Sequence, residues 1–254
     1  MNTIKIEYVE NYAFLRLNRG RANAINAEMA NELLDALTVL KTNEKVRGVI
    51  LSGHGEFFSA GLDVVELYNY NEQQISDFWK LFSKLARRLV AFPKPLIAAI
   101  TGHSPAGGCV LALGCDYRVM ATGTYRIGLN EIPFGIVVPD TIYNLYGFVI
   151  GMGKAYEYLL EGKLLTPEEA LACNLVNEIT SLEEVENKAI EKLKVYMKLN
   201  QNVWTQSKLN FRTDLLQRLN PDFESTFEAT LKQWWAPETR AIIEHMIASL
   251  KKRD

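Results

Sequence analysis

The stretch KPLIAAITGHSPAGGCVLALGCD, residues 94–116, decides the fold of this chain. It consists of an apolar run typical of a buried strand, then a glycine-containing turn, then an apolar helix. A turn that leads from a strand into a helix leaves backbone N–H groups exposed at the helix start, where negative charge is stabilised. The stretch therefore predicts an α/β protein with a place for an anion or a developing oxyanion.

Strand-like and helical runs alternate on either side of this stretch. Alternating apolar residues predict an antiparallel strand pair near the N-terminus, and Met29 and Leu33 begin an apolar series at helical spacing. Two prolines end a second helix just before the buried strand. The sequence predicts strands at 4–9, 12–17, 46–52 and 96–101, and helices at 27–41 and 75–91. Repeated strand–helix–strand units of this kind are typical of an α/β fold.

The second half of the chain is predicted to be mainly helical. Thr166 supplies a helix cap with a proline directly after it, and every pattern beyond about residue 200 is helical. Residues 212–222 are polar enough to form a joint. Residues 237–252 form an amphipathic helix that packs either on its own body or on another subunit. We therefore divide the chain into a core, 1–200, and a C-terminal helical region, 201–254.

Composition and charge exclude several classes of function. Of 254 residues, 48% are hydrophobic, which suits one large domain, and the formal net charge is −2. We expect no nucleic-acid partner, because no basic surplus exists, and no membrane association, because no apolar run reaches about 20 residues. Three cysteines without CxxC spacing, Cys109, Cys115 and Cys173, predict free thiols. With an N-terminus unlike a signal peptide, these features predict a soluble cytoplasmic protein.

A serine hydrolase is one alternative for the quoted stretch. The segment Gly102-His103-Ser104-Pro105-Ala106 nearly matches the nucleophile-elbow pattern G-x-S-x-G. However, the residue after the nucleophile must donate its N–H to the oxyanion, and proline has none. The match therefore fails on physical grounds.

Two further alternatives concern bound cofactors. Gly151-Met152-Gly153 lacks the third glycine and the preceding strand of a dinucleotide-binding turn, so a helix boundary is the better interpretation. No histidine pair has metal-ligand spacing, and we expect no metal site at His54, His103 or His245.

The fourth candidate joins two glycine turns with one carboxylate. Phe57–Asp63 and Thr101–Gly108 each follow a predicted strand, so one backbone amide from each turn could converge on one oxygen atom and stabilise an enolate. Glu131 stands among apolar neighbours, which raises a carboxylate's pKa and suits proton transfer. Taken singly, a glycine turn before a helix is more often a packing or capping device, and Glu131 alone would most often be a solvated turn residue.

In these segments the chain resembles the crotonase superfamily, the enoyl-CoA hydratase/isomerase family. The resemblance spans nearly the whole core in the family's order, and five correctly spaced segments together are specific. They are LNRGRANAINAEM (17–29), FSAGLD (58–63), KPLIAAITGHSPAGGCVLALGCDYRVMA (94–121), IGLNEIPFGIVVP (127–139) and LTPEEALACNLVNEI (165–179). The resemblance implies a spiral of repeated ββα units followed by C-terminal helices. Within the family the chain is most similar to Δ3,Δ2-enoyl-CoA isomerases of the mitochondrial type.

The resemblance also implies catalytic residues. The two oxyanion donors fall on the backbone amides of Leu62 and Gly107. Family hydratases carry two glutamates; here the first position is Val110, and the second is Glu131. Hydration usually employs both acids, whereas moving a double bond from position 3 to position 2 needs one base. The implied reaction is therefore conversion of 3-enoyl-CoA to trans-2-enoyl-CoA in fatty acid β-oxidation. Two alternatives remain: a hydratase or another enolate chemistry on acyl-CoA, and a non-catalytic acyl-CoA-binding protein.

The substrate coenzyme A is the only cofactor-like group that the resemblance implies. Its binding residues fall on two loops: Arg21, Ala22, Asn23 and Ala24 in the first, and Ala60, Gly61, Leu62 and Asp63 in the second. Asp63 is also placed to cap the helix that follows. Arg19 and Arg21 are either phosphate-binding cations or solvated loop charges.

The wall of the acyl site and the assembly are also expected from the resemblance. Aromatic residues after the first turn either line an acyl channel or belong to the core, and the same choice applies to Trp234 and Trp235. Those after the turn are Tyr68, Tyr70, Phe78, Trp79 and Phe82. The resemblance further implies a homotrimer or a hexamer.

Overall fold

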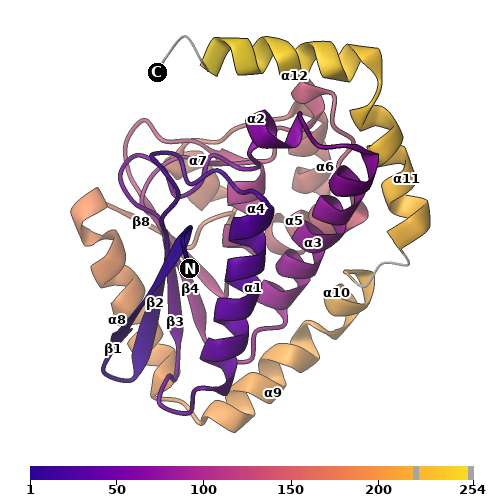
Figure 1. The fold of residues 1–254 in the computed structure, drawn as a ribbon. Coiled ribbons are helices and arrows are strands. Elements are labelled where there is room, and N and C mark those ends of the chain that lie inside the picture. The colour runs from indigo at the N-terminus through magenta and orange to yellow at the C-terminus, as the bar shows by residue number, and fades with distance from the viewer. Residues whose placement is uncertain (220–222, 251–254) are drawn as a thin grey trace.

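A six-stranded sheet forms the centre of the fold, in the strand order β1-β2-β3-β4-β6-β8 (Figure 1). The computed structural model describes residues 1–219 and 223–250, together with the side chains of all of these except 223–226. The strands are β1 (Ile4–Val9), β2 (Tyr12–Leu17), β3 (Val49–Ser52), β4 (Leu96–Ile100), β6 (Tyr117–Ala121) and β8 (Glu178–Thr180). Only β1 and β2 pair in antiparallel fashion, and the other four pairings are parallel.

A small second sheet lies at the ends of these strands. Its two strands, β5 (Ser104–Pro105) and β7 (Ile127–Gly128), pair in parallel. Ser104 lies opposite Ile127, and Pro105 lies opposite Gly128. This pairing brings the turn after β4 beside the segment that leads to Glu131, although the two are distant in the sequence.

Helices cover both faces of the main sheet. The helices of the core are α1 (Ala27–Thr42), α2 (Val64–Leu67), α3 (Glu72–Val90), α4 (Gly107–Leu113), α5 (Asp140–Ile150), α6 (Met152–Glu161), α7 (Pro167–Ala172) and α8 (Val185–Met197). Short 3-10 helices, η1 (Ile132–Phe134) and η2 (Leu182–Glu184), complete it. The α/β fold class predicted from the sequence is confirmed.

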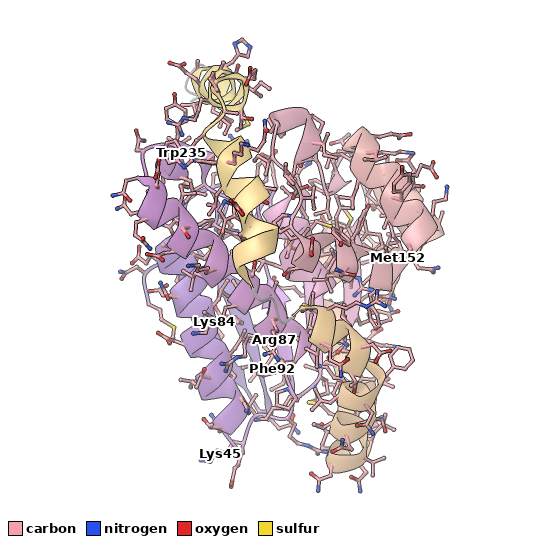
Figure 2. All side chains as sticks on the ribbon, turned by 90° about the vertical axis from the view of Figure 1, so that its right-hand side faces the viewer. Lys45, Lys84, Arg87, Phe92, Met152 and Trp235 are labelled. Carbon is pink, nitrogen blue, oxygen red and sulfur yellow. The ribbon has the colours of Figure 1, made fainter. Side chains whose placement is uncertain are left out.

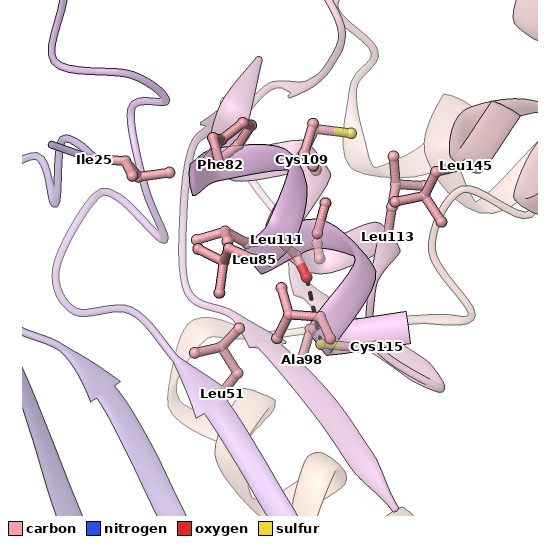
Figure 3. Packing of buried hydrophobic residues seen from close by; sticks show 14 of the residues in the cluster. Ile25, Leu51, Phe82, Leu85, Ala98, Cys109, Leu111, Leu113, Cys115 and Leu145 are labelled. Carbon is pink, nitrogen blue, oxygen red and sulfur yellow. Dashed lines mark hydrogen bonds between the residues drawn. The ribbon is translucent and has the colours of Figure 1, made fainter. Parts of the chain in front are cut away.

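The alternation of side chains along the strands creates two apolar cores. On β4, Ala98 and Ile100 face the larger core beneath α1, α3 and α4, whereas Ile97 and Ala99 face α8. Successive strand residues point to opposite faces, so each face of the sheet is apolar and needs a helical cover. Figure 3 shows the larger core, in which Cys115 Sγ lies 3.5 Å from the backbone carbonyl of Leu111.

The predicted element bounds agree closely with the structure. Both N-terminal strands have the predicted limits, and the helix predicted at 27–41 ends one residue later. The helix predicted at 75–91 begins earlier, at Glu72, because Asn71 forms a capping box with Gln74. The strand predicted at 46–52 is shorter, since it begins at Val49. Thr166 forms the predicted cap, also as a capping box.

The C-terminal helices run from the bottom of the core along its right-hand side and over its top (Figure 1). They are α9 (Gln201–Phe211), α10 (Thr213–Arg218), α11 (Phe223–Trp234) and α12 (Pro237–Leu250). The joint predicted at 212–222 contains α10, and its positions 220–222 lie outside the described residues, as do positions 251–252 of the last predicted helix. Within this chain α12 contacts α2 and η1. Packing on another subunit stays a prediction.

Candidate active site

A cavity of about 310 Å³ lies where the predicted site segments converge. Leu62, Gly107 and Glu131 all line it, although they come from three different turns. Apolar side chains form most of the remaining wall, and they come from α3, α5 and the C-terminal helices. A concave, mainly apolar site with a few polar groups is the usual form of a small-molecule site.

The first turn presents the N–H group of Leu62. Gly61, with φ +90°, reverses the chain there, and its carbonyl accepts a 2.8 Å hydrogen bond from the N–H of Ile25. The N–H of Asp63 donates to the carbonyl of Ile25, also at 2.8 Å. Within the described part of the chain, the intervening N–H of Leu62 donates to no protein acceptor. Because its neighbours are fixed on both sides, this N–H is held in place and available to a ligand.

The second turn presents the N–H group of Gly107, the first residue of α4. Ala106 has φ +47° and ψ −121°, a conformation that is strained for a residue with a side chain. Its N–H donates to the carbonyl of Gly128 at 2.8 Å, which anchors the turn on β7. Among residues 1–219 and 223–250, the N–H of Gly107 has no protein acceptor either.

The two N–H groups lie next to each other. A Cβ atom on Gly107 would stand 3.3 Å from the backbone nitrogen of Leu62, and one on Gly61 would stand 3.2 Å from the backbone nitrogen of Gly107. The absence of a side chain at Gly108 permits this close approach of the two turns, because a Cβ there would come within 2.3 Å of the carbonyl oxygen of Ser59. The turns thus bring together two donors suited to one oxygen atom.

Glu131 is the buried acid of the cavity. Its residue is 6% exposed, and among the described residues its Oε2 has no hydrogen-bond partner. Burial raises the pKa of its carboxyl to about 7, against a weaker opposing effect of its own backbone N–H. Its backbone carbonyl accepts from the N–H groups of Phe134 (2.9 Å) and Ile136 (3.1 Å). A carboxyl with this pKa exchanges protons readily near neutral pH.

Val110 lies on α4 with its side chain fully buried in the larger core. It does not line the cavity, and it offers only hydrocarbon at the position where related hydratases are expected to carry a second acid. Asn130, directly before Glu131, does line the cavity; its Oδ1 is buried without a partner in the described chain. The sequence analysis did not single out Asn130, because an asparagine in a turn has many structural explanations.

The predicted coenzyme A loops occupy one side of the cavity. Ala22, Ala24, Ala60, Leu62 and Asp63 line it, whereas Arg21, Asn23 and Gly61 do not. The carboxylate of Asp63 accepts from the N–H of Glu66 at 3.0 Å and thereby caps α2, as predicted.

The two arginines of the first loop both have carboxylate partners. Arg19 pairs with Asp63 at 2.7 Å and with Glu66 at 3.0 Å, and it also donates to the carbonyl of Ala24. Arg21, which is largely exposed, pairs with Glu56. Arg19 therefore stabilises the loop, and binding of phosphates by either arginine stays a prediction.

Aromatic residues divide between the cavity wall and the core. Trp79, Phe82 and Trp234 line the cavity. The other aromatic candidates, Tyr68, Tyr70, Phe78 and Trp235, do not. Met246 and Leu250 of α12 add to the wall, and no local pattern in the sequence distinguishes them from other apolar residues of an amphipathic helix.

The other candidate chemistries find no support in the described residues. Ser104 is fully buried and its Oγ has no partner within them. Gly151, with φ +83°, forms the predicted helix boundary between α5 and α6. No group of three or more metal-ligating side chains occurs in the described chain, and no described helix is long and apolar enough to cross a membrane.

Comparison with known proteins points to one family. The sequence profile of the enoyl-CoA hydratase/isomerase family matches residues 8–239. The mouse protein "Enoyl-CoA delta isomerase 1, mitochondrial" is 40% identical over 179 residues, which are 70% of this chain and 62% of the mouse protein. The human protein of that name is 33% identical over 82% of this chain and 69% of its own length. The matches to the mouse and rat relatives thus span less than two thirds of their length.

Relatives with a different named activity also match. A short-chain-enoyl-CoA hydratase of Clostridium acetobutylicum is 32% identical over 75% of this chain and 74% of its own length. Among solved structures, human mitochondrial delta3-delta2-enoyl-CoA isomerase has a TM-score of 0.94 at 28% identity, with 99% of both chains covered. An enoyl-CoA hydratase from Bacillus halodurans has a TM-score of 0.87 at 22% identity, which shows the shared fold alone.

Proposed function

The chain belongs to the enoyl-CoA hydratase/isomerase family, and from that premise we propose that it is an enzyme that converts 3-enoyl-CoA to trans-2-enoyl-CoA. One observation carries the proposal: a single buried carboxyl, Glu131, shares a cavity with two adjacent unbonded N–H groups. The reaction fits the degradation of unsaturated fatty acids. It needs no cofactor besides the coenzyme A of its substrate.

The N–H groups of Leu62 and Gly107 hold the thioester oxygen. When a proton leaves C2, the electron pair is delocalised onto this oxygen, which then carries the negative charge of a dienolate. Donors already in place stabilise that charge without reorganisation, and each is worth on the order of 3 kcal/mol. Because both are backbone groups, their positions depend on the two turns rather than on side-chain identity.

Glu131 moves the proton. As the carboxylate it removes a proton from C2, and the C3–C4 double bond shifts to become the C2–C3 double bond. The resulting carboxylic acid returns the proton to C4, which regenerates the carboxylate and balances the reaction. A pKa of about 7 suits both steps, because neither form of the group is strongly favoured near neutrality.

The cavity lining offers no second acid that is free of protein partners, and this favours isomerisation over hydration. Among the side chains that line the cavity, Asp63 is the other carboxylate, and it is held by the α2 N-terminus and by Arg19. Val110 cannot activate water. Water addition would therefore rest on Glu131 alone.

We also propose that the chain acts as a homotrimer or a pair of trimers. A surface groove of about 530 Å³ lies between η1, α5 and α6, and its apolar border includes Met152, Tyr156 and Leu160. These three side chains are each more than half exposed, and Met152 is labelled on the face in Figure 2. An exposed apolar patch of this kind is typical of an interaction surface, and the resemblance to the family makes another copy the expected partner. Light scattering of the purified protein tests the assembly. We retain 1–200 as the acyl-CoA-binding core and 201–254 as a C-terminal helical region that serves oligomerisation or covers the site.

The function is tested with two substrates. The protein is incubated with 3-hexenoyl-CoA and, separately, with crotonyl-CoA, and products are separated by chromatography. An isomerase consumes the first, and a hydratase adds water to the second. Turnover of neither compound would favour a non-catalytic acyl-CoA-binding protein. Full activity of Glu131→Gln towards 3-hexenoyl-CoA would show that the base lies elsewhere.

A further inference from the structure

The turn that carries Glu131 is bonded to the last helix of the chain. The hydroxyl of Thr239, fully buried near the start of α12, donates to the backbone carbonyl of Gly135 at 3.0 Å. The same hydroxyl accepts a 2.9 Å hydrogen bond from Nε2 of Gln233. The hydroxyl is thus fixed by both a donor and an acceptor.

Gly135 is linked to the backbone of Glu131 through its two chain neighbours. Glu131 and Gly135 flank η1, and Gly135 ends it in the left-handed conformation, with φ +71°. The N–H groups on either side of Gly135, those of Phe134 and Ile136, both bond to the carbonyl of Glu131. A Cβ on Gly135 would lie 2.7 Å from Oγ1 of Thr239, so the contact is close as well as directional. A shift of Thr239 would therefore be transmitted to Glu131.

A second buried threonine supports the same loop. Thr230 of α11 donates to the carbonyl of Val137 at 3.3 Å. Its side chain is 1% exposed, so water cannot readily replace this bond.

The residue after Thr239 contacts the segment that follows the first glycine turn. Arg240 donates to the carbonyl of Tyr68 at 2.9 Å, and its guanidinium lies 3.5 Å from the centre of the Tyr68 ring. Tyr68 is the C-cap of α2, the short helix that begins directly after Asp63. Leu62, with its unbonded N–H, immediately precedes that cap. Adjacent residues of α12 therefore contact the turn that carries Glu131 and the short helix that follows the Leu62 turn.

We propose that Thr239 and Arg240 are positioning residues that fix Glu131 relative to the N–H donors at Leu62 and Gly107. The C-terminal helices thus do more than cover the cavity, because they set the distance between base and oxyanion site. This inference rests on the proposed function of Glu131. Misplacement of a reacting group by about 1 Å can lower a rate on the order of 100-fold, so a support of this kind affects catalysis directly.

The test compares two threonines that make similar bonds. Thr239→Val keeps the side-chain shape and removes the hydroxyl, whereas Thr239→Ser keeps the hydroxyl. Thr205→Val is the matched control: Thr205 of α9 bonds the carbonyl of Pro93 at 2.6 Å, also joining a C-terminal helix to the core, but it does not line or support the cavity. Melting temperature, kcat and KM for 3-hexenoyl-CoA are measured for each.

We expect Thr239→Val to lower kcat by about 10-fold to 100-fold with KM within about threefold, and Thr239→Ser to restore most of the loss. Thr205→Val should leave kcat within about twofold of the parent value, even if it lowers the melting temperature as much as Thr239→Val does. Unchanged kcat in Thr239→Val, or equal loss in the control, would overturn the inference. Arg240→Lys and Arg240→Met should likewise lower kcat with little change in KM, and the kcat of the lysine variant should be closer to that of the parent.

A double variant separates this inference from the proposed function. If Thr239 acts through Glu131, adding Thr239→Val to Glu131→Gln should cause no further loss of kcat. A further loss of the full size would mean that Thr239 acts independently. If Glu131→Gln is itself fully active, the proposed function fails, and the single variants still report whether α12 affects turnover.

Discussion

The side-chain amide of Asn23 donates a 3.2 Å hydrogen bond to the backbone carbonyl of Phe58 and so joins two loops that lie 35 residues apart in the sequence. Its Oδ1 accepts from the N–H of Arg19 at 2.9 Å, and its backbone has φ +47°. On either side of this link, Ala22 and Ala60 line the cavity. Asn23, which is fully buried, therefore determines the shape of the expected coenzyme A site without lining it.

Replacing Asn23 should weaken both folding and substrate binding. Asn23→Ala leaves the buried hydrogen-bond partners of the asparagine side chain unsatisfied. It also places alanine at a positive φ without the side-chain hydrogen bonds that support asparagine there. We therefore expect a loss of about 2–4 kcal/mol in the free energy of unfolding. KM for acyl-CoA should rise as the loops separate. Asn23→Gly relieves only the backbone strain. If urea unfolding gave both variants the stability of the parent, the proposed role of this link would be refuted.

Gly107→Ala should reduce catalysis more than stability. The added methyl group would lie 3.0 Å from Leu62 Cδ2 and 3.3 Å from the Leu62 nitrogen, between the two donors. Losing one oxyanion donor typically lowers kcat by about 10²-fold to 10³-fold, and we expect a loss of that order. Gly153→Ala is the matched control, because a Cβ there meets nothing within 4 Å. Similar steady-state rates for the two variants would contradict an oxyanion role.

The activity should depend on the ionisation of Glu131. Since the base must be a carboxylate and its pKa is raised to about 7, kcat/KM should rise about tenfold per pH unit up to that value and then level off. At and above that pH, Glu131→Gln should lower kcat by about 10²-fold to 10⁴-fold, and it should remove this pH dependence. A parent profile that is flat from pH 5.5 to 8 would exclude Glu131 as the titrating base.

The same pKa shift predicts a pH-dependent stability. Between its unfolded value of 4.5 and about 7, Glu131 holds its proton in the folded state but loses it in the unfolded state. The contribution of Glu131 to the free energy of unfolding is therefore largest at low pH. It declines by about 3 kcal/mol in total as the pH rises to about 7. Relative to the parent, Glu131→Gln should become more stable across this window. Urea unfolding at pH 5 and pH 8 measures the difference, and a constant difference would contradict burial of the charged form.

A buried ionic network joins α9 to the core. The carboxylate of Asp116 pairs with Lys208 at 2.8 Å and Arg212 at 3.1 Å and also accepts from the N–H of Leu96. Asp116→Asn removes the counterion of two buried cations, so we expect a loss of about 3–5 kcal/mol in the free energy of unfolding. Lys208→Met, which leaves Asp116 paired with Arg212, should cost less. Equal losses in urea unfolding would show that the pairs do not act together.

Much of the fold follows from local sequence patterns. Strand alternation gives β1 and β2 their limits, and the capping box at Thr166 starts α7 where predicted, because caps and periodicity act within a few residues. The start of α3 is predicted less accurately. Polar residues 72–74 show no apolar periodicity, and only the side-chain hydrogen bonds of Asn71 extend the helix to them. The short α10 in the predicted joint likewise shows no clear local pattern.

The candidate site was predictable only in part. The sequence identified Leu62, Gly107 and Glu131 through their motifs, and the structure brings them to one cavity. It could not reveal the support of Glu131 by Thr239, because a threonine on an amphipathic helix has no pattern that names its partner about 100 residues away. It also left open which aromatic side chains form the wall.

The sequence by itself determined the α/β fold, the two glycine turns and the presence of one acid without a partner acid, because each depends on residue type and short-range spacing. Tertiary structure alone decided that the two N–H groups meet, that Glu131 is buried deeply enough to raise its pKa to about 7, and that α12 closes over its own cavity. The physical reason is that desolvation and hydrogen bonding between distant segments depend on packing in three dimensions, which local spacing does not specify.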